Sequence, residues 1–145
     1  MNDFVKHMIT FNDLELNECT TSEEFEQHMN HLITYRYKKM SHVYSIENVF
    51  IEDKMFNLTF RFKDENGQKL LRKIELAPLG CKNLTDEQFF EMNKKWLASK
   101  LGTPHSTGVG SVIYKYVDVT IHAYFLGYSQ DKDSSPILGF NITFG

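Results

Sequence analysis

The segment that decides the fold reads FNLTFRFK, residues 56–63. Its apolar and polar residues alternate without a break, which is the period of a strand with one buried and one solvated face. Such a strand is typical of an antiparallel sheet that is covered on one side only. The next four residues, DENG at 64–67, predict a hairpin turn, because Asn-Gly accepts positive φ at low cost. We therefore expect an antiparallel sheet that extends outward from this hairpin.

Two groups of strands and two helices follow from the same patterns. The first helix is expected to open at Thr21, where TSEE forms a capping box ahead of Phe25 and Met29 at helical spacing. The second is expected to open at Thr85 with TDEQ and to stop at Gly102. Upstream of Thr21, apolar residues from Ile9 to Leu16 predict a short strand or an extended lead-in. The expected strands are 43–51, 55–63 and 69–77 after the first helix, and 111–116, 117–127 and 137–144 after the second.

These elements repeat. Thr21–Phe25 matches Thr85–Phe89 at an offset of 64, and Leu58 and Phe62 match Ile121 and Phe125 at an offset of 63. The prediction is an α+β fold: a single domain, 1–145, of two consecutive units (about 18–78 and 82–145). Each unit holds one helix and three antiparallel strands, and the two units share one core because neither can bury its helix and sheet face alone.

Composition supports a packed, non-membrane protein. The chain has 145 residues, of which 41% are hydrophobic and 14% aromatic, so a core can form without disulfides. No stretch approaches the roughly 20 apolar residues of a membrane span, and the N-terminus does not read as a secretory signal. We expect a cytoplasmic location, with Cys19 and Cys81 as free thiols. A disulfide between them would require the two units to pack symmetrically.

Charge is unevenly distributed along the chain. Residues 1–35 hold seven acids and one base, whereas the other 110 residues hold 12 acids and 15 bases, for a net charge of −3 overall. Such a segment attracts basic partners and repels nucleic acid. A solvated helix start would also explain several of these acids, because carboxylates stabilise a helix N-terminus. The predicted partner-binding residues are six acids: Asp13, Glu15, Glu18, Glu23, Glu24 and Glu26.

Patterns that carry catalysis or bind cofactors are weak in this sequence. His28 and His31 share one side of the first helix near Cys19, but no second ligand pair accompanies them, so no metal is expected. Gly108-x-Gly110 precedes a strand, whereas a phosphate-binding loop precedes a helix. His122 would need a neighbouring carboxylate to act as a base. We predict no catalytic residue, no cofactor and no enzyme activity.

Single-stranded nucleic acid is the alternative partner. Arg36, Lys38 and Lys39 lie among tyrosines, and a second basic group is expected on the sheet. Basic residues interleaved with aromatic residues can contact phosphates and stack on bases. The residues concerned are Tyr35, Tyr37 and Tyr44, together with Arg61, Lys63, Lys69, Arg72 and Lys73.

The second half resembles a group of small bacterial proteins. The resemblance rests on TDEQF at 85–89, KWL at 95–97, LG-x-P at 101–104 and Tyr114-x-Tyr116 ahead of the strand 119–125. Some members of this group are similar to immunity proteins of contact-dependent inhibition and polymorphic toxin systems. The resemblance implies a small cytoplasmic protein without catalytic residues that binds a cognate protein toxin and blocks its active site or an adjacent surface. A nuclease toxin is commonly basic, which would suit an acidic inhibitor.

Overall fold

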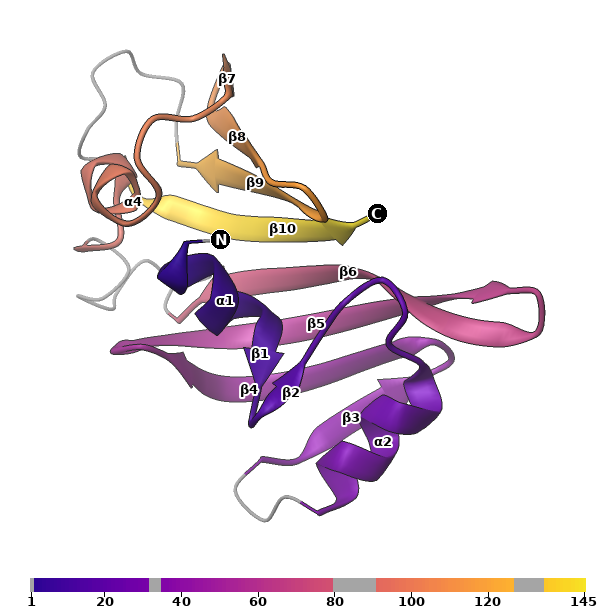
Figure 1. Cartoon of the computed structure of the whole chain (residues 1–145). Helices are drawn as coiled ribbons and strands as arrows, with labels where there is room; N and C mark the ends of the chain where they lie inside the picture. Colours follow the sequence, from indigo (N-terminus) through magenta and orange to yellow (C-terminus); the bar gives the residue numbers. More distant parts are fainter. Residues whose placement is uncertain (1, 32–34, 80–90, 127–134) are drawn as a thin grey trace.

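The structure, a computed structural model, describes residues 2–31, 35–79, 91–126 and 135–145. These residues form an α+β fold with three described helices and two antiparallel sheets, one large and one of two short strands (Figure 1). The helices are α1 (Asp3–Ile9), α2 (Ser22–Asn30) and α4 (Lys94–Leu101). The strands are β1 (Thr10–Phe11), β2 (Leu14–Glu15), β3 (Tyr37–Met40), β4 (Val43–Ile51), β5 (Lys54–Glu65), β6 (Gln68–Pro78), β7 (Ser106–Gly108), β8 (Ser111–Lys115), β9 (Val119–Phe125) and β10 (Ile137–Phe144).

The large sheet has eight strands in the order β3-β4-β5-β6-β10-β9-β8-β7. The chain fills one half from the edge inward and then the other half from the opposite edge inward. The last strands of the two halves, β6 and β10, pair antiparallel at the centre, with Ile74 opposite Ile142 (Figure 1). The halves therefore have the same topology and are joined into one continuous sheet.

The hydrogen-bonded register repeats as well. Leu58 faces Leu76 between β5 and β6, and Ile121 faces Ile142 between β9 and β10. Leu58 and Ile121, matched by the sequence repeat, thus occupy equivalent places in the two halves. Irregularities also coincide: one interrupts β5–β6 at Arg61/Phe62, and the other interrupts β10–β9 between Ile137 and Gly139.

Two details of the predicted units differ from the structure. Within the described residues, four strands follow α2 and four follow α4, whereas three were predicted in each unit. The additional strands are the short edge strands β3 and β7. The described part of the second helix begins at Lys94, capped by Asn93, whose side chain accepts a hydrogen bond from the Trp96 amide at 2.9 Å. The capping box at 85–88 lies outside the described residues.

The helix caps occupy equivalent places, although their sequences do not align. Thr21 forms an isolated bridge with Leu70 just inside β6, and Asn93 forms one with Pro136 just before β10. The hydroxyl of Thr21 accepts a hydrogen bond from the Glu24 amide at 3.1 Å, as the first capping box predicts. Thr21 therefore corresponds in space to Asn93, whereas the sequence repeat had matched it to Thr85.

The expected short strand or extended lead-in from Ile9 to Leu16 is present as β1 and β2, but Ile9 itself ends the unexpected helix α1. Asn2 caps this helix by accepting hydrogen bonds from the amides of Phe4 and Val5. Seven residues are too few for a recognisable helical period, so tertiary packing decides this element. Its apolar side is buried, and Phe4 packs edge-on against Trp96 of α4 at 5.4 Å.

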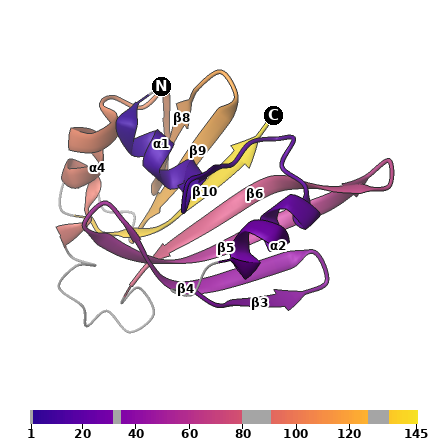
Figure 2. The same cartoon turned by 60° about the horizontal axis from the view of Figure 1, so that its bottom comes forward.

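The core lies between the helices and one face of the large sheet (Figure 2). Phe25 of α2 is fully buried against Tyr44, Phe60 and Phe62. On the other half, the hydroxyl of Tyr114 donates to the carbonyl of Gly102 at the end of α4. In the described part of the chain, no helix packs on the opposite face of the sheet, which is called the open face below. None of the described helices is long and apolar enough to cross a membrane.

Candidate functional site

The six predicted acids, called the acidic segment below, lie in the first half on the β1–β2 hairpin, on α2 and, for Glu18, on the segment that connects them. Asp13 stands in the tight turn between β1 and β2, where its φ is 70°, and Glu15 follows on β2. Glu23 and Glu24 occupy the first turn of α2. The two elements are tied together, because the Nε2 of His28 on α2 lies 2.6 Å from the carbonyl oxygen of Asn12. The turn therefore neighbours the C-terminal end of α2, whereas Glu23 and Glu24 lie at the opposite end of the helix (Figure 1).

Five of the six carboxylates are exposed and form no ion pair with any described residue: Asp13, Glu15, Glu18, Glu23 and Glu24. An exposed carboxylate without a partner keeps its full charge for an incoming cation. Glu23 and Glu24 also stabilise the helix N-terminus that they flank. Both side chains remain exposed in this structural role, so their carboxylates can still contact a partner.

Glu26 differs from the other five. It is half-buried, and its Oε1 lies 2.7 Å from the Nζ of Lys39 on β3. The hydrogen bond with Lys39 lowers the pKa of Glu26 and raises the pKa of Lys39. Glu26 therefore joins α2 to the edge strand β3, and its charge is largely neutralised by a base that is distant in sequence.

A hollow of about 330 Å³ borders the acidic segment next to Glu26. Its lining mixes both signs of charge, since Glu23 and Glu26 come from α2 while Lys39 and Lys69 come from β3 and β6. The acidic segment is thus bounded by bases on the side of the strands. Asp13, Glu15, Glu18 and Glu24 do not line this hollow.

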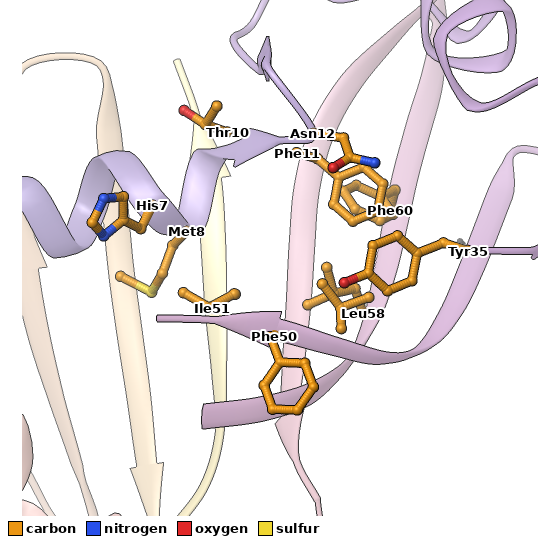
Figure 3. Close-up of a pocket in the computed structure, with 11 residues that line it drawn as sticks. His7, Met8, Thr10, Phe11, Asn12, Tyr35, Phe50, Ile51, Leu58 and Phe60 are labelled. Atoms are coloured by element: carbon orange, nitrogen blue, oxygen red, sulfur yellow. The ribbon is translucent and has the colours of Figure 1, made fainter. Parts of the chain in front are cut away.

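A second hollow lies where α1 and β1 approach the end of β4 (Figure 3). It encloses about 60 Å³ among apolar side chains that include Met8, Phe11 and Tyr35, and an adjoining, more open hollow of about 310 Å³ reaches Asp13 and Glu52. In Figure 3, the ring of Phe50 points away from the other labelled side chains. The enclosed volume suits a few water molecules and is too small for a typical ligand pocket of several hundred Å³.

Glu52, at the rim of that hollow, connects the two halves. Its carboxylate lies 2.8 Å from the Nζ of Lys100 on α4 and 2.9 Å from the Nδ1 of His7 on α1. Both contacts lower the pKa of Glu52, and the contact with Lys100 has the larger effect. This cluster explains the position of His7 structurally, as a link between α1 and the β4–β5 turn.

The metal and catalytic candidates stay apart. His28 contacts the Asn12 carbonyl, and the described residues contain no group of three His, Cys, Asp or Glu side chains that could hold a metal ion. His122 lies on the open face, stacked on Tyr124 with ring centroids 4.3 Å apart. Among the described contacts, its neighbours are Tyr124 and, across the strands, Asn141 and Ile113, and no carboxylate pairs with it. Cys19 is a free, exposed thiol, and Cys81 lies outside the described residues.

The nucleic-acid alternative depended on tyrosines that the fold places in or against the core. Tyr44 is buried beneath α2, while Tyr35 and Tyr37 are half-buried against the core. Several of the bases are already paired: Arg61 with Glu75, Arg72 with Glu65 and Lys39 with Glu26. Base stacking requires exposed ring faces, which these three tyrosines do not offer.

The comparisons with known proteins give no match from which a family or function could be inferred. No protein-family model, no curated protein and no solved structure matches it. The resemblance of the second half to immunity proteins therefore stays a prediction.

The open face is the surface that sequence reasoning missed. It spans both halves and places Thr59, Glu75, Asn141 and His122 in one row across four neighbouring strands. The outward residues of each strand were visible in the alternation, but their joining into one surface depends on the β6–β10 pairing. No local sequence pattern predicts that pairing, because the two strands are some 60 residues apart in the chain.

Proposed function

We propose that this protein is a non-catalytic, cytoplasmic immunity protein that binds and neutralises a basic protein toxin, of the nuclease type, by covering its active site or an adjacent surface. The acidic segment is the proposed binding surface. The observation that carries the proposal is that five carboxylates between residues 13 and 24 are exposed and form no ion pair with any described residue: Asp13, Glu15, Glu18, Glu23 and Glu24.

Electrostatics gives this surface a definite kind of partner. Carboxylates that are not neutralised within the protein attract a cationic surface and raise its association rate, in a way that salt screens over about 10 Å. Proteins that bind nucleic-acid backbones present such cationic surfaces. Covering that surface would block both substrate binding and access to the catalytic residues.

The shape of the segment supports protein rather than small-molecule binding. Its acids lie on a helix start, a tight turn and the segment between them. Of the hollows beside it, one is too small for a ligand, and the other is lined mainly by polar side chains of both signs of charge. A specific protein interface needs roughly 800 Å² on each partner, which only an extended surface supplies. Charge at the rim of such an interface governs the association rate more than the final affinity.

The test starts from the neighbouring upstream gene. Its product is co-expressed with the tagged protein, and we expect the two to co-purify and the toxin's activity to be inhibited in a nuclease assay. Replacing Glu15, Glu18, Glu23 and Glu24 together by Lys should abolish co-purification at low salt. Binding that survives this reversal unchanged would overturn the acidic-segment mechanism, and an upstream product that neither binds nor harms cells would overturn the immunity function.

A further inference from the structure

The open face carries two bands of different chemistry at opposite ends of its strands. The apolar band consists of four exposed side chains: Phe50, Tyr124, Leu126 and Leu138. Phe50 is 57% exposed, and each of the other three is 38% exposed. The basic band lies towards the end of β5, in the middle of β6 and at the end of β8: Arg61, Lys63, Lys73 and Lys115. Large apolar side chains gathered on one side of a protein mark interaction surfaces more often than scattered ones do.

The register places the two bands on the same side of the sheet. Arg61 pairs with Lys73, and Lys73 pairs with Thr143 on the next strand. Thr143 pairs with Thr120, which pairs with Lys115. Tyr124 lies four residues beyond Thr120 on β9, which corresponds to about 13 Å along the strand. A partner that reaches both bands must therefore extend for at least four residues in the strand direction.

The basic band keeps part of its charge. Glu75 lies 2.6 Å from Arg61 and 3.7 Å from Lys73, so those two bases are partly neutralised. Lys63 and Lys115 are exposed and form no ion pair with a described residue. Charge complementarity thus points to a partner that presents carboxylates or phosphates at this end of the face.

The apolar band decides between these two chemistries. Leu126 and Leu138 offer aliphatic contacts that pack well against apolar side chains but give no stacking platform for bases, so only Phe50 and Tyr124 contribute rings to this band. The ring of Tyr124 is already stacked on His122 with an interplanar angle of 21°, so one of its faces is occupied. The Glu75 carboxylate inside the basic band limits the number of anionic groups that this end can hold, which disfavours a strand with a phosphate at every nucleotide more than a segment with a few carboxylates.

We infer that the open face is a second interaction surface, which takes an extended protein segment bearing carboxylates at one end and a large apolar side chain four to six residues away. The acidic segment, by contrast, lies on the helix-covered side of the sheet and selects basic partners. The two surfaces are chemically opposite, so one protein can hold two different partners at once. This inference does not depend on the toxin.

The experiment uses the full chain and a capped ten-residue peptide probe, with three Asp or Glu at one end and Leu and Phe at the other. Backbone amide resonances of the 15N-labelled protein are followed during titration, and Kd is measured by fluorescence anisotropy. We expect shifts confined to open-face residues of β4, β5, β6, β8, β9 and β10. Weaker binding by about fivefold or more is expected for Lys63→Glu/Lys115→Glu and for Leu126→Ser/Leu138→Ser.

Controls separate this surface from the acidic segment. Lys6→Glu/Lys95→Glu makes the same charge change at exposed positions off the open face and should leave the Kd unchanged. The reversal of Glu15, Glu18, Glu23 and Glu24 should also leave it no weaker, whether or not the toxin proposal holds. All variants are first checked for native spectra.

Four results would overturn the inference. The first is no peptide binding up to millimolar concentration, and the second is equal binding of polyglutamate, which lacks the apolar end. The third is tighter binding of a twelve-nucleotide oligothymidylate at the same resonances, which would assign the face to single-stranded nucleic acid. The fourth is a self-associated form in sedimentation that the open-face variants dissociate, which would assign the face to a second copy of the chain.

Discussion

The helices α2 and α4 follow the same topology in the two halves of one sheet, yet their charges are opposite. The first turn of α2 carries Glu23 and Glu24, and that of α4 carries Lys94 and Lys95. A helix N-terminus favours carboxylates, so the acids of α2 suit its dipole, whereas the lysines of α4 oppose theirs. The comparison teaches that the fold tolerates either sign of charge in the first turn of these helices. The acidic character of the first half is therefore a property of its surface rather than a requirement of the fold.

The buried sides of the two helices also differ, and this difference gives the largest expected effect. Phe25→Ala removes a ring packed against Tyr44, Phe60 and Phe62, so the free energy of unfolding should fall by about 3–5 kcal/mol. Leu97→Ala, in the second half, should cost about 2–4 kcal/mol. Urea unfolding followed by circular dichroism measures both. A single transition is expected in each variant, and two separate transitions would show that the halves do not share one core.

The caps test the spatial correspondence between Thr21 and Asn93. Each accepts a hydrogen bond from the amide three residues on, so Thr21→Ala and Asn93→Ala should each lower the free energy of unfolding by about 1 kcal/mol. Thr21→Ser and Asn93→Asp keep an accepting oxygen and serve as matched controls, with losses of a few tenths of a kcal/mol. A negligible loss for Asn93→Ala would mean that the second helix does not depend on this cap.

The smallest stability effect concerns the link between the halves. Since Lys100 and His7 lower the pKa of Glu52 in the folded state, its ionised form stabilises the fold. This contribution is complete above the unfolded-state pKa of about 4.3 and is lost as the pH falls from there through the lowered folded-state pKa. Glu52→Gln should therefore flatten the acid side of the stability–pH curve. The exposed Asp53→Asn is the control, and an unchanged curve for Glu52→Gln would contradict the link.

Local patterns predicted much of this fold. The alternation at 56–63, the Asn66-Gly67 turn and the cap at Thr21 each depend on neighbours in sequence, and the structure has all three, with Asn66 and Gly67 at φ values of 55° and 85°. The helix α1 and the edge strands β3 and β7 were missed, because elements of three to seven residues are decided by tertiary contacts. The open face was missed for the same reason, since it exists only through the β6–β10 pairing.

The candidate site was predictable in composition but not in arrangement. The sequence places six acids between residues 13 and 26, and the structure keeps five of them exposed. It could not show that Lys39 approaches Glu26, because that contact follows from the packing of the edge strand against α2. Nor could it show that Lys69 lines the same hollow. The acids that are available to a partner are therefore fewer than the six that the sequence suggests.

The most direct test of the difference between the halves is the Kd of the co-purified basic toxin for two variants of equal charge change. One reverses Glu15, Glu18, Glu23 and Glu24 to Lys, and the other reverses four exposed acids elsewhere: Glu47, Asp53, Asp64 and Asp118. Calorimetry at low salt should show a loss of at least about a hundredfold for the first variant and less than about tenfold for the second. Equal losses would contradict the account, because the toxin would then respond to net charge rather than to the acidic segment.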